Sequence, residues 1–486
     1  MLFDAASQSD RLGQVCNAPW GSAIANEGEK IMTQDVIAKW ELSRRRVLGG
    51  AAAAAGLGGF GSGVDALAQA AGPWSQAPRS KVDRLNFVVW TYGDIYSRIA
   101  KQFETDWGVK VDTTISSFND HPTKLTTMFA AGEKIDVSQS SPFSFPNFIE
   151  QGLVEPIDAL PGAAEYIKDF SNFTKQVATY KGKTMGLPYF AAVWVWNYYA
   201  DMLEKLKIDK PFATYEEFIE HCVKAKKDGV SRYPVLWVAG VGLEQLPGTW
   251  YQMTWNRGGV FFDKQGNHML GAGSIARETL KFWANTFEKG LDISDPESLK
   301  VQFTSSAKAF GAGKNLYRGP NHHYGLNIAN DPSQSPIAGK VKVHGSPGDG
   351  KTIGVTHVYF LSSATRDKEW GWKLLQYLGG RTKDGNYTQA IGLAKDAMLG
   401  SGYNSVMNSD AVKQGWAPWG DVPAILKMWD QAAYIGEVCS SVYQPWHFPW
   451  TDQLNIEVQK TLTGQITADQ CCDNLIKGIA DAKRKI

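Results

Sequence analysis

The stretch RLNFVVW at residues 84–90 begins an alternation of strand and helix patterns that decides the fold. Its β-branched and aromatic residues predict a strand. Apolar residues then recur every four positions from Ile95 to Phe103, which predicts an amphipathic helix that ends near Trp107. A strand that leads directly into a helix is the first unit of an α/β fold.

The following segments repeat this order. Residues 109–115 alternate as a strand, residues 122–131 have a helical pattern, and residues 135–138 form a third strand pattern before a helix at 144–151. This order implies a parallel sheet with right-handed crossovers and a ligand site at the carboxyl ends of the strands. Polar and aromatic side chains occupy those predicted strand ends, namely Trp90, Tyr92, Asn119, Asp120, His121 and Ser141.

The composition of the 486-residue chain is that of an ordinary globular protein, except for its aromatic residues. A single hydrophobic core stops growing at roughly 250–300 residues, so two domains are expected. The formal net charge of +1 offers no basic field for nucleic acid or anionic lipid, and such partners are not expected. The 18 Trp and 18 Tyr exceed what packing requires, so we expect some of them to face a ligand.

The N-terminal region contains an export signal pattern. Residues 43–46, SRRR, precede a weakly apolar, glycine-rich run at residues 47–60. This arrangement resembles a twin-arginine signal peptide with cleavage near Ala68 to Ala70. The apolar run is shorter than the about 18–20 residues that a membrane span needs. Because no cysteine lies near the cleavage site, we expect a free periplasmic protein rather than a lipoprotein.

Residues 1–70 are accordingly interpreted as an N-terminal extension followed by the signal peptide. Residues 1–31 have no apolar periodicity, so translation starts at either Met1 or Met32. A G-x-G-x-x-G pattern at residues 56–61 matches a dinucleotide-binding motif, but no strand pattern precedes it and it lies in the segment expected to be removed.

A set of short motifs in the mature chain resembles a known family. In order they are GLVEPI at 152–157, GLPY at 186–189, WVWNYY at 194–199, PFATYEEF at 211–218, NRGGVFFD at 256–263, F-x-x-G-K at 310–314 and LTGQIT at 462–467. Their order and spacing are similar to those of sugar-type extracellular solute-binding proteins of ABC importers, over about residues 83–486. The chain departs from the family pattern at Ala200, where Asn is usual, and at Leu316-Tyr317, which replace Ala-Met.

The resemblance implies the type II periplasmic-binding-protein fold, an α/β architecture of two discontinuous lobes joined by a hinge. It also implies a small ligand, a sugar or polyol, an ABC permease in the inner membrane as partner, a monomeric state, and no cofactor. The hinge would lie near residues 189–194 and near residues 345–350. Carried onto this chain, the lobes would be residues 83–189 plus 352–398 for lobe one and residues 193–345 plus 403–486 for lobe two.

Aromatic residues at predicted strand ends and loops are candidates to contact a sugar. A pyranose presents an apolar C–H face that lies flat against an indole, while its hydroxyl groups need polar partners. The aromatic candidates are Trp90, Tyr92, Tyr189, Trp194, Trp250, Trp255 and Trp419. The polar candidates are Asn119, Asp120, Ser141, Arg318 and His357, and Arg318 could alternatively pair with a carboxylate or sulfonate on the ligand.

Three patterns that could indicate other chemistry lack the context they need. GSPGDGKT at residues 345–352 matches a phosphate loop, but a phosphate loop requires a helix directly after it, and residues 353–360 have a strand pattern. No two histidines are spaced to bind a metal, and the adjacent His322 and His323 would point in different directions. No G-x-S-x-G elbow or evident carboxylate pair indicates catalysis, so the chain is interpreted as a non-enzyme.

The pairing of the mature cysteines stays open. A bridge from Cys439 to Cys471 or Cys472 is conceivable in an oxidising compartment. We therefore predict a periplasmic substrate-binding component of an ABC transporter that captures a carbohydrate or related polar solute. The alternatives are an exported carbohydrate-active enzyme and a binder of an acidic or polyamine solute on the same fold.

Overall fold

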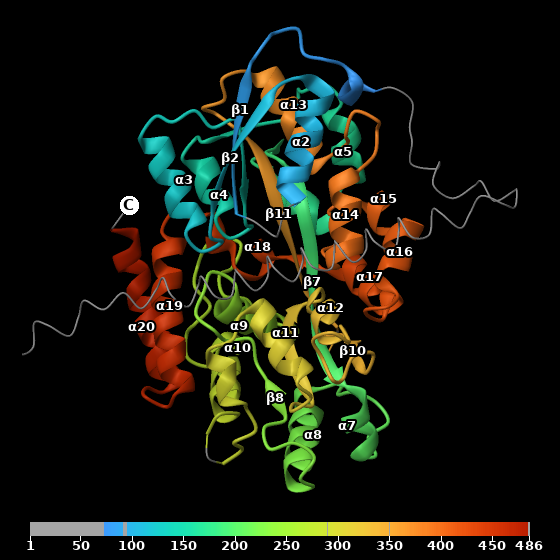
Figure 1. Ribbon diagram of the computed structural model, residues 1–486. Helices are drawn as coiled ribbons and strands as arrows, with labels where there is room; N and C mark the ends of the chain where they lie inside the picture. The colour runs from blue at the N-terminus through green and yellow to red at the C-terminus, as the bar shows by residue number, and fades with distance from the viewer. Residues whose placement is uncertain (1–71, 91–94, 289, 349, 485–486) are drawn as a thin grey trace, which may run out of the picture.

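The computed structural model describes residues 72–90, 95–288, 290–348 and 350–484. The predicted signal peptide and Tyr92 therefore lie outside the described residues. The described part forms two α/β lobes, the first above the second in Figure 1. Strand β7 (Leu187–Tyr199) runs from the first lobe into the second. In the part of the chain that the structure describes, no helix is long and apolar enough to cross a membrane.

The strand and helix order predicted for the first lobe is confirmed. Strand β1 pairs in parallel with both β2 and β3, which places it between them. The third strand lies two residues later than predicted, because Val137 pairs with Phe87 of β1 and Ser140 pairs with Val358. The elements are β1 (Arg84–Trp90), α2 (Ile95–Trp107), β2 (Lys110–Ser116), α3 (His121–Ala130), β3 (Val137–Ser140) and α4 (Phe145–Glu150).

A late segment of the chain completes the sheet of the first lobe. Strand β11 (Ile353–Ser362) lies between β3 and β7 and is antiparallel to both. Helix α13 (Lys368–Gly379) follows it and packs on α2, where the Phe103 and Tyr377 rings lie 5.1 Å apart. The expected strand and helix after residue 352 are thus present. Because Ile353 begins a strand and not a helix, the preceding glycine-rich segment lacks the helix N-terminus that a phosphate loop requires.

Strand β7 changes partners where it enters the second lobe. Up to Val193 it pairs with β11, and from Trp194 it pairs with β9 (Tyr317–His322). Strand β8 (Val235–Leu236) adds to β9 in parallel, and β10 (Val341–His344) pairs with the far end of β7. One continuous strand therefore belongs to the sheets of both lobes.

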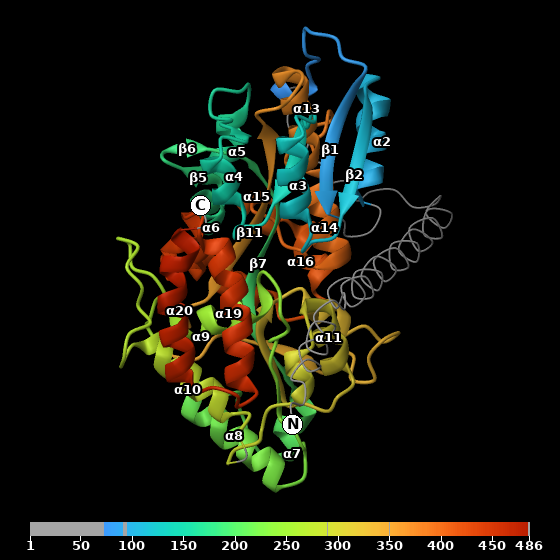
Figure 2. The ribbon, with the colours of Figure 1, turned by 90° about the vertical axis from the view of Figure 1, so that its left-hand side faces the viewer.

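Helices cover the second lobe and the junction (Figures 1 and 2). Those of the second lobe are α7 (Ala200–Lys205), α8 (Tyr215–Lys227), α9 (Gln245–Asn256), α10 (Ile275–Asn285), α11 (Phe303–Gly311), α12 (Gly325–Ala329), α19 (His447–Leu462) and α20 (Ala468–Lys483). The remaining described helices are α5 (Ala163–Asp169), α6 (Asn172–Ala178), α14 (Thr388–Ala397), α15 (Asn404–Met407), α16 (Asp410–Trp416), α17 (Val422–Gln431) and α18 (Ile435–Val438). Short strands are β4 (Val154–Glu155), β5 (Thr179–Tyr180), β6 (Lys183–Thr184) and β12 (Ala433–Tyr434), and 3-10 turns lie at Pro73–Ser75, Pro296–Leu299 and Ser440–Tyr443.

Residues 403–434, which the sequence assigns to the second lobe, contact both lobes. Tyr403 packs on Tyr166 of the first lobe, with ring centroids 6.2 Å apart. Ala433 of β12 pairs with Ile353 at the start of β11, while α17 contacts both β7 and β10. This segment therefore packs across the junction and links the two lobes.

The described cysteines are free thiols. Cys222, Cys439, Cys471 and Cys472 are all buried, and no disulfide joins them. Burial raises the pKa of Cys439 to about 12, which keeps its thiol protonated at physiological pH.

Candidate functional site

The carboxyl ends of the parallel strands of the first lobe face the second lobe. In Figure 2 the arrows of β1 and β2 point down toward α11. Trp90 is the last residue of β1, and Phe118 and Asn119 follow β2. This is the edge of an α/β sheet where ligands bind.

Trp90 lies in a cluster of rings and is only 2% exposed. Its ring is 5.3 Å from that of Phe118, 4.8 Å from that of His121 and 6.4 Å from that of Tyr189, centroid to centroid. Its indole Nε1 is buried and has no hydrogen-bond partner among the described residues. A buried indole normally finds an acceptor, so this donor is available to a bound molecule.

His357 reaches the same cluster from β11. Its ring stacks on that of Phe190, with centroids 4.3 Å apart and planes 15° apart, and lies 5.7 Å from the ring of Trp90. The pairing of β7 with β11 shifts register between His357 and Val358, so that Tyr189 is an extra residue on β7. Such a bulge redirects side chains and is common next to binding sites.

Glu244 approaches His357 from the second lobe. It is the residue before helix α9, and its Oε1 lies 3.5 Å from Nε2 of His357. Both side chains are almost completely buried. Neither carboxylate oxygen of Glu244 and neither ring nitrogen of His357 has a hydrogen-bond partner in the described part of the chain.

His322, the last residue of β9, contributes to the site from the second lobe. Its ring stacks on Phe303 at 4.5 Å and lies 5.4 Å from the ring of Trp194 and 5.2 Å from that of Tyr324. Burial lowers the pKa of His322 well below its usual value, and nearby His357 adds to this effect. Neutral His322 has one donor and one acceptor nitrogen, both without partners among the described residues.

These residues define the interlobe cluster, which combines apolar ring faces with unpaired polar atoms. More than nine in ten buried polar groups in proteins are hydrogen-bonded, so a concentration of unpaired ones at one place indicates a site for a polar ligand or water. Tyr324 joins the rings around His322 to those around His357, since its ring contacts both His322 and Phe190. The interlobe cluster consists of Trp90, Phe118, Asn119, Phe190, Trp194, Glu244, Phe303, His322, Tyr324 and His357.

The structure brings together four of the residues proposed from the sequence. Trp90, Asn119, Trp194 and His357 belong to the interlobe cluster, and the atoms Trp90 Nε1, Asn119 Oδ1 and Trp194 Nε1 are buried without partners among the described residues. Tyr189 lies beside them, and its hydroxyl is hydrogen-bonded to that of Tyr96. Ser141 is buried after β3, where its Oγ lies 3.2 Å from Oγ of Ser144.

Other proposed residues are engaged elsewhere. The guanidinium of Arg318 is buried and donates to Ser306 Oγ, to Asn197 Oδ1 and to the carbonyl oxygen of Phe303. Burial lowers the pKa of Arg318 to about 10, and the neutral acceptors that surround it position the strand against α11. Arg318 is thus satisfied by the chain itself.

The remaining candidates lie apart from the interlobe cluster. Trp250 packs on Phe261 at 4.6 Å in the core of the second lobe, and its Nε1 donates to the carbonyl oxygen of Ala276. Trp255 is half-buried beneath the ammonium of Lys351. Trp419 is half-buried, and its carbonyl oxygen accepts a hydrogen bond from the side-chain amide of Asn330. Asp120 is exposed and accepts a hydrogen bond from the Ser117 hydroxyl.

Sequence reasoning did not find Glu244, His322, Phe190 or Tyr324 as site residues. Phe118 directly precedes Asn119 after β2, so the same strand-end argument applies to it. Glu244 lies in a loop with no periodic pattern, directly before α9. For His322 the sequence leaves open a solvated loop or hydrogen bonding to a sugar, and the structure shows that it is the last residue of β9 and is buried.

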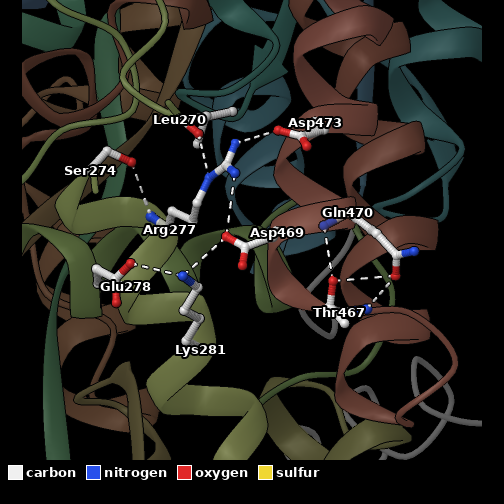
Figure 3. Close-up of polar contacts among 9 residues, drawn as sticks. All are labelled: Leu270, Ser274, Arg277, Glu278, Lys281, Thr467, Asp469, Gln470 and Asp473. Atoms are coloured by element: carbon white, nitrogen blue, oxygen red, sulfur yellow. Dashed lines mark hydrogen bonds and ion pairs between the residues drawn. The ribbon is translucent and has the colours of Figure 1, made fainter. Parts of the chain in front are cut away.

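A surface hollow of about 410 Å³ lies on the second lobe between α10 and the loop before α20. Lys281 and Asp469 line the hollow and belong to a charged network with Arg277, which donates to Asp473 at 2.6 Å and to Asp469 at 3.3 Å (Figure 3). Lys281 bridges Asp469 and Glu278, each at 3.1 Å. These charges are paired with one another, and the network ties α10 to α20. Among the described residues, no group of His, Cys, Asp and Glu could hold a metal ion.

Two lobes that share a strand and enclose buried polar atoms define a protein that binds a small molecule between its lobes. Residues 90–382, more than half of the chain, match the model of the family described as bacterial extracellular solute-binding protein. The chain belongs to this family. Binding proteins of Brucella abortus (strain 2308) and Brucella suis biovar 1 (strain 1330) are each 26% identical to it over 317 residues, which is 62% of this chain and 72% of each relative.

Solved structures agree with the fold. The maltose-bound MalE3 of T. maritima superposes with a TM-score of 0.69 at 20% identity, covering 83% of this chain and 100% of the other. An ABC transporter solute-binding protein of Agrobacterium radiobacter in complex with ribitol gives a TM-score of 0.68 at 18% identity, covering 83% and 98%. The architecture is the type II periplasmic-binding-protein fold, as the sequence predicted.

Proposed function

We propose that this protein captures a sugar or polyol between its two lobes and delivers it to an ABC importer. The observation that carries the proposal is the interlobe cluster, in which rings such as Trp90 and Phe190 surround buried polar atoms without partners among the described residues. Ring faces suit the C–H surface of a sugar, and unpaired donors and acceptors suit its hydroxyl groups. Proteins of the same fold have been solved with maltose, ribitol and D-mannitol.

The mechanism follows from the placement of these residues on opposite lobes. Trp90 and His357 come from the first lobe, and Glu244 and His322 come from the second. A ligand that contacts both sets binds the closed form more tightly than the open form, and it therefore shifts the equilibrium toward closure. The closed form is then what the permease would distinguish from the empty protein.

The proposal includes an exported, monomeric protein that is not an enzyme. The twin-arginine pattern supports a periplasmic location. Hydrolysis of a glycosidic bond requires two carboxyl groups that flank the bond. The interlobe cluster as defined above contains one carboxylate, Glu244, which supports binding rather than catalysis.

A ligand screen tests the proposal. The mature protein is mixed with monosaccharides, oligosaccharides, polyols and amino acids, and the melting temperature is measured for each. A ligand at 100 times its Kd stabilises the folded state by about 2.7 kcal/mol, which gives a clear increase in melting temperature. We expect a sugar or polyol to give this increase, to change tryptophan fluorescence, and to reduce the radius of gyration. Binding of amino acids alone, or recovery of a cleaved oligosaccharide, would contradict the proposal.

A further inference from the structure

Glu244 brings a carboxyl group into the interlobe cluster without a full partner from the chain. Its side chain is 0% exposed, and its two oxygens accept no hydrogen bond from any described residue. Removing an ionised carboxylate from water costs several kcal/mol unless it is paired and hydrogen-bonded. A cationic group on a bound ligand would supply the partner that the described chain does not give.

The chain supplies only part of this compensation. The N-terminus of α9, which directly follows Glu244, contributes roughly half an elementary charge, but the carboxylate makes no side-chain cap hydrogen bond to it. His357 is nearest, and its Nε2 lies 3.5 Å from Oε1, beyond hydrogen-bond distance. Even a charged His357 would face only one of the two oxygens.

Arg318, a buried cation in β9, is engaged by other groups. Its three donor nitrogens are occupied by Ser306, Asn197 and the carbonyl oxygen of Phe303. A Cβ atom at Gly325 would lie 2.8 Å from its Nη1, so the backbone of α12 closes over the guanidinium. This packing holds the guanidinium of Arg318 against Ser306, Asn197 and Phe303.

The surroundings of His357 suit a cation. The rings of Phe190, Trp90 and Phe118 lie 4.3, 5.7 and 6.0 Å from its ring. Aromatic faces attract ammonium groups, most strongly where water is excluded. A protonated amine next to Glu244 would also donate charge-assisted hydrogen bonds to both of its oxygens.

We propose that Glu244 binds a protonated amine on the ligand, so that the preferred solute is an amino sugar or an aminated polyol. This inference rests on the proposed function, because it concerns the ligand of the same interlobe site. It deepens that function by assigning Glu244 as the residue that selects a cationic member of the sugar and polyol class.

Titration calorimetry at neutral pH with matched pairs of compounds tests the inference. The pairs are D-glucose and D-glucosamine, D-galactose and D-galactosamine, and D-glucitol and 1-amino-1-deoxy-D-glucitol. N-acetyl-D-glucosamine serves as the uncharged amide. We expect at least one aminated compound to bind about tenfold or more tightly than its neutral partner, a difference of about 1.4 kcal/mol. We expect the acetylated compound to lose this advantage.

The variant Glu244→Gln keeps the shape of the side chain and removes the charge. It should reduce the preference for the amine to less than about threefold, since charge-assisted hydrogen bonds are roughly twice as strong as neutral ones. Glu297→Gln makes the same charge change at an exposed carboxylate of the second lobe and should leave the preference unchanged. If Glu244→Gln does not fold, the comparison of matched pairs on the unaltered protein still shows whether the site prefers an amine.

The outcomes separate the two proposals. Neutral compounds that bind as tightly as their aminated partners would overturn the role of Glu244 and leave sugar or polyol binding intact. Failure of every aminated compound to bind would also overturn it, whether or not neutral compounds bind. If no sugar or polyol of any kind binds, the proposed function fails as well.

Discussion

The indole of Trp194 lies directly against Gly248 in helix α9. A Cβ atom at position 248 would come within 1.9 Å of the edge of the Trp194 ring. Trp194 is the residue at which β7 passes from β11 to β9, and α9 begins just after Glu244. The glycine therefore sets how closely the carboxylate of the second lobe approaches the strand that joins the lobes.

We predict that Gly248→Ala lowers both stability and ligand affinity. In an open helix position alanine stabilises by roughly 0.5–1 kcal/mol relative to glycine, but here the added methyl group would displace Trp194 or α9. We expect a lower melting temperature and an affinity reduced about tenfold or more, because a shift of Glu244 changes both lobes' contacts. Calorimetry and thermal unfolding measure the two effects.

Gly392→Ala is the matched control for this prediction. Gly392 lies inside helix α14, and an added Cβ would come no closer than 3.9 Å to a neighbouring side chain. This variant should keep or increase the melting temperature and leave affinity unchanged. If Gly248→Ala and Gly392→Ala had the same effects on melting temperature and affinity, the contact between Gly248 and Trp194 would not matter for either.

We predict that Trp90→Phe weakens ligand binding with little loss of stability. Phenylalanine keeps an aromatic ring among Phe118, His121 and Tyr189, while the unpaired indole Nε1 is removed. Loss of one hydrogen bond of about 0.5–1.5 kcal/mol corresponds to about a two- to tenfold lower affinity. Trp250→Phe removes the hydrogen bond to Ala276 instead, so its effect should appear in the melting temperature and not in the affinity. If Trp90→Phe lowered only the melting temperature and Trp250→Phe lowered only the affinity, Trp90 would belong to the core and Trp250 to the site.

Trp90 and Trp250 differ in how well the sequence alone predicts the location of their rings. Trp90 follows from a local pattern, since a β-strand in a parallel sheet directs its carboxyl end toward the ligand site. Trp250 lies on a helix whose twelve residues are nearly all buried, so the pattern gives no preferred face. The location of its ring depends on Phe261, which the helix pattern does not specify.

Residues that meet only through contacts between distant parts of the sequence could not be predicted. Glu244 and His357 lie far apart in the sequence and meet through the folding of two separate lobes. The bulge that turns His357 toward the site is a register shift between β7 and β11, and it leaves no composition signal. The first lobe was predictable because its strand and helix order is local, whereas the interlobe cluster is a product of long-range packing.

We predict that export depends on the consecutive arginines before the glycine-rich run. Arg44→Lys combined with Arg45→Lys keeps the charge and should leave unprocessed precursor in the cytoplasm, because twin-arginine signals are recognised by a receptor rather than by charge alone. Cell fractionation with detection of precursor and mature forms measures the effect. Arg46→Lys is the control and should be exported. Normal periplasmic yield of the double variant would show that another signal directs export.

We predict that Arg277→Met destabilises the second lobe without changing ligand binding. The Arg277 side chain is 6% exposed, and it donates to Leu270, Asp469 and Asp473. Its carboxylate partners are more than half exposed and can be solvated again, so we expect a loss of about 1–2 kcal/mol rather than that of a fully buried pair. Lys281→Met, at an exposed position of the same network, should cost less than about 0.5 kcal/mol. A change in ligand affinity with either variant would indicate that the surface hollow communicates with the interlobe site.

We predict that acid destabilises the protein through its buried histidines, and that His447 accounts for about one proton of this effect. Burial lowers the pKa of His447 to about 3, while its Nδ1 lies 2.9 Å from Ser441 Oγ inside the second lobe. Because the pKa in the folded state is depressed, the unfolded chain binds more protons than the folded chain between the two pKa values. The stabilisation from neutral His447 is therefore fully present above an unfolded pKa of about 6.5 and is lost as pH falls toward the folded pKa.

The magnitude of this loss can be measured as a slope. One histidine with these properties lowers the free energy of unfolding by about 1.4 kcal/mol for each pH unit below about 6.5. Burial also lowers the pKa of His323 to about 3 and that of His121 to about 4, so the wild-type protein should show a steeper dependence than one group can produce. Urea unfolding at a series of pH values gives the slope. His447→Gln should reduce it by about one proton, whatever its effect at neutral pH, whereas His268→Gln, at an exposed histidine, should leave it unchanged. Parallel pH profiles for wild type and His447→Gln would mean that His447 is protonated in the folded state and that other groups cause the acid sensitivity.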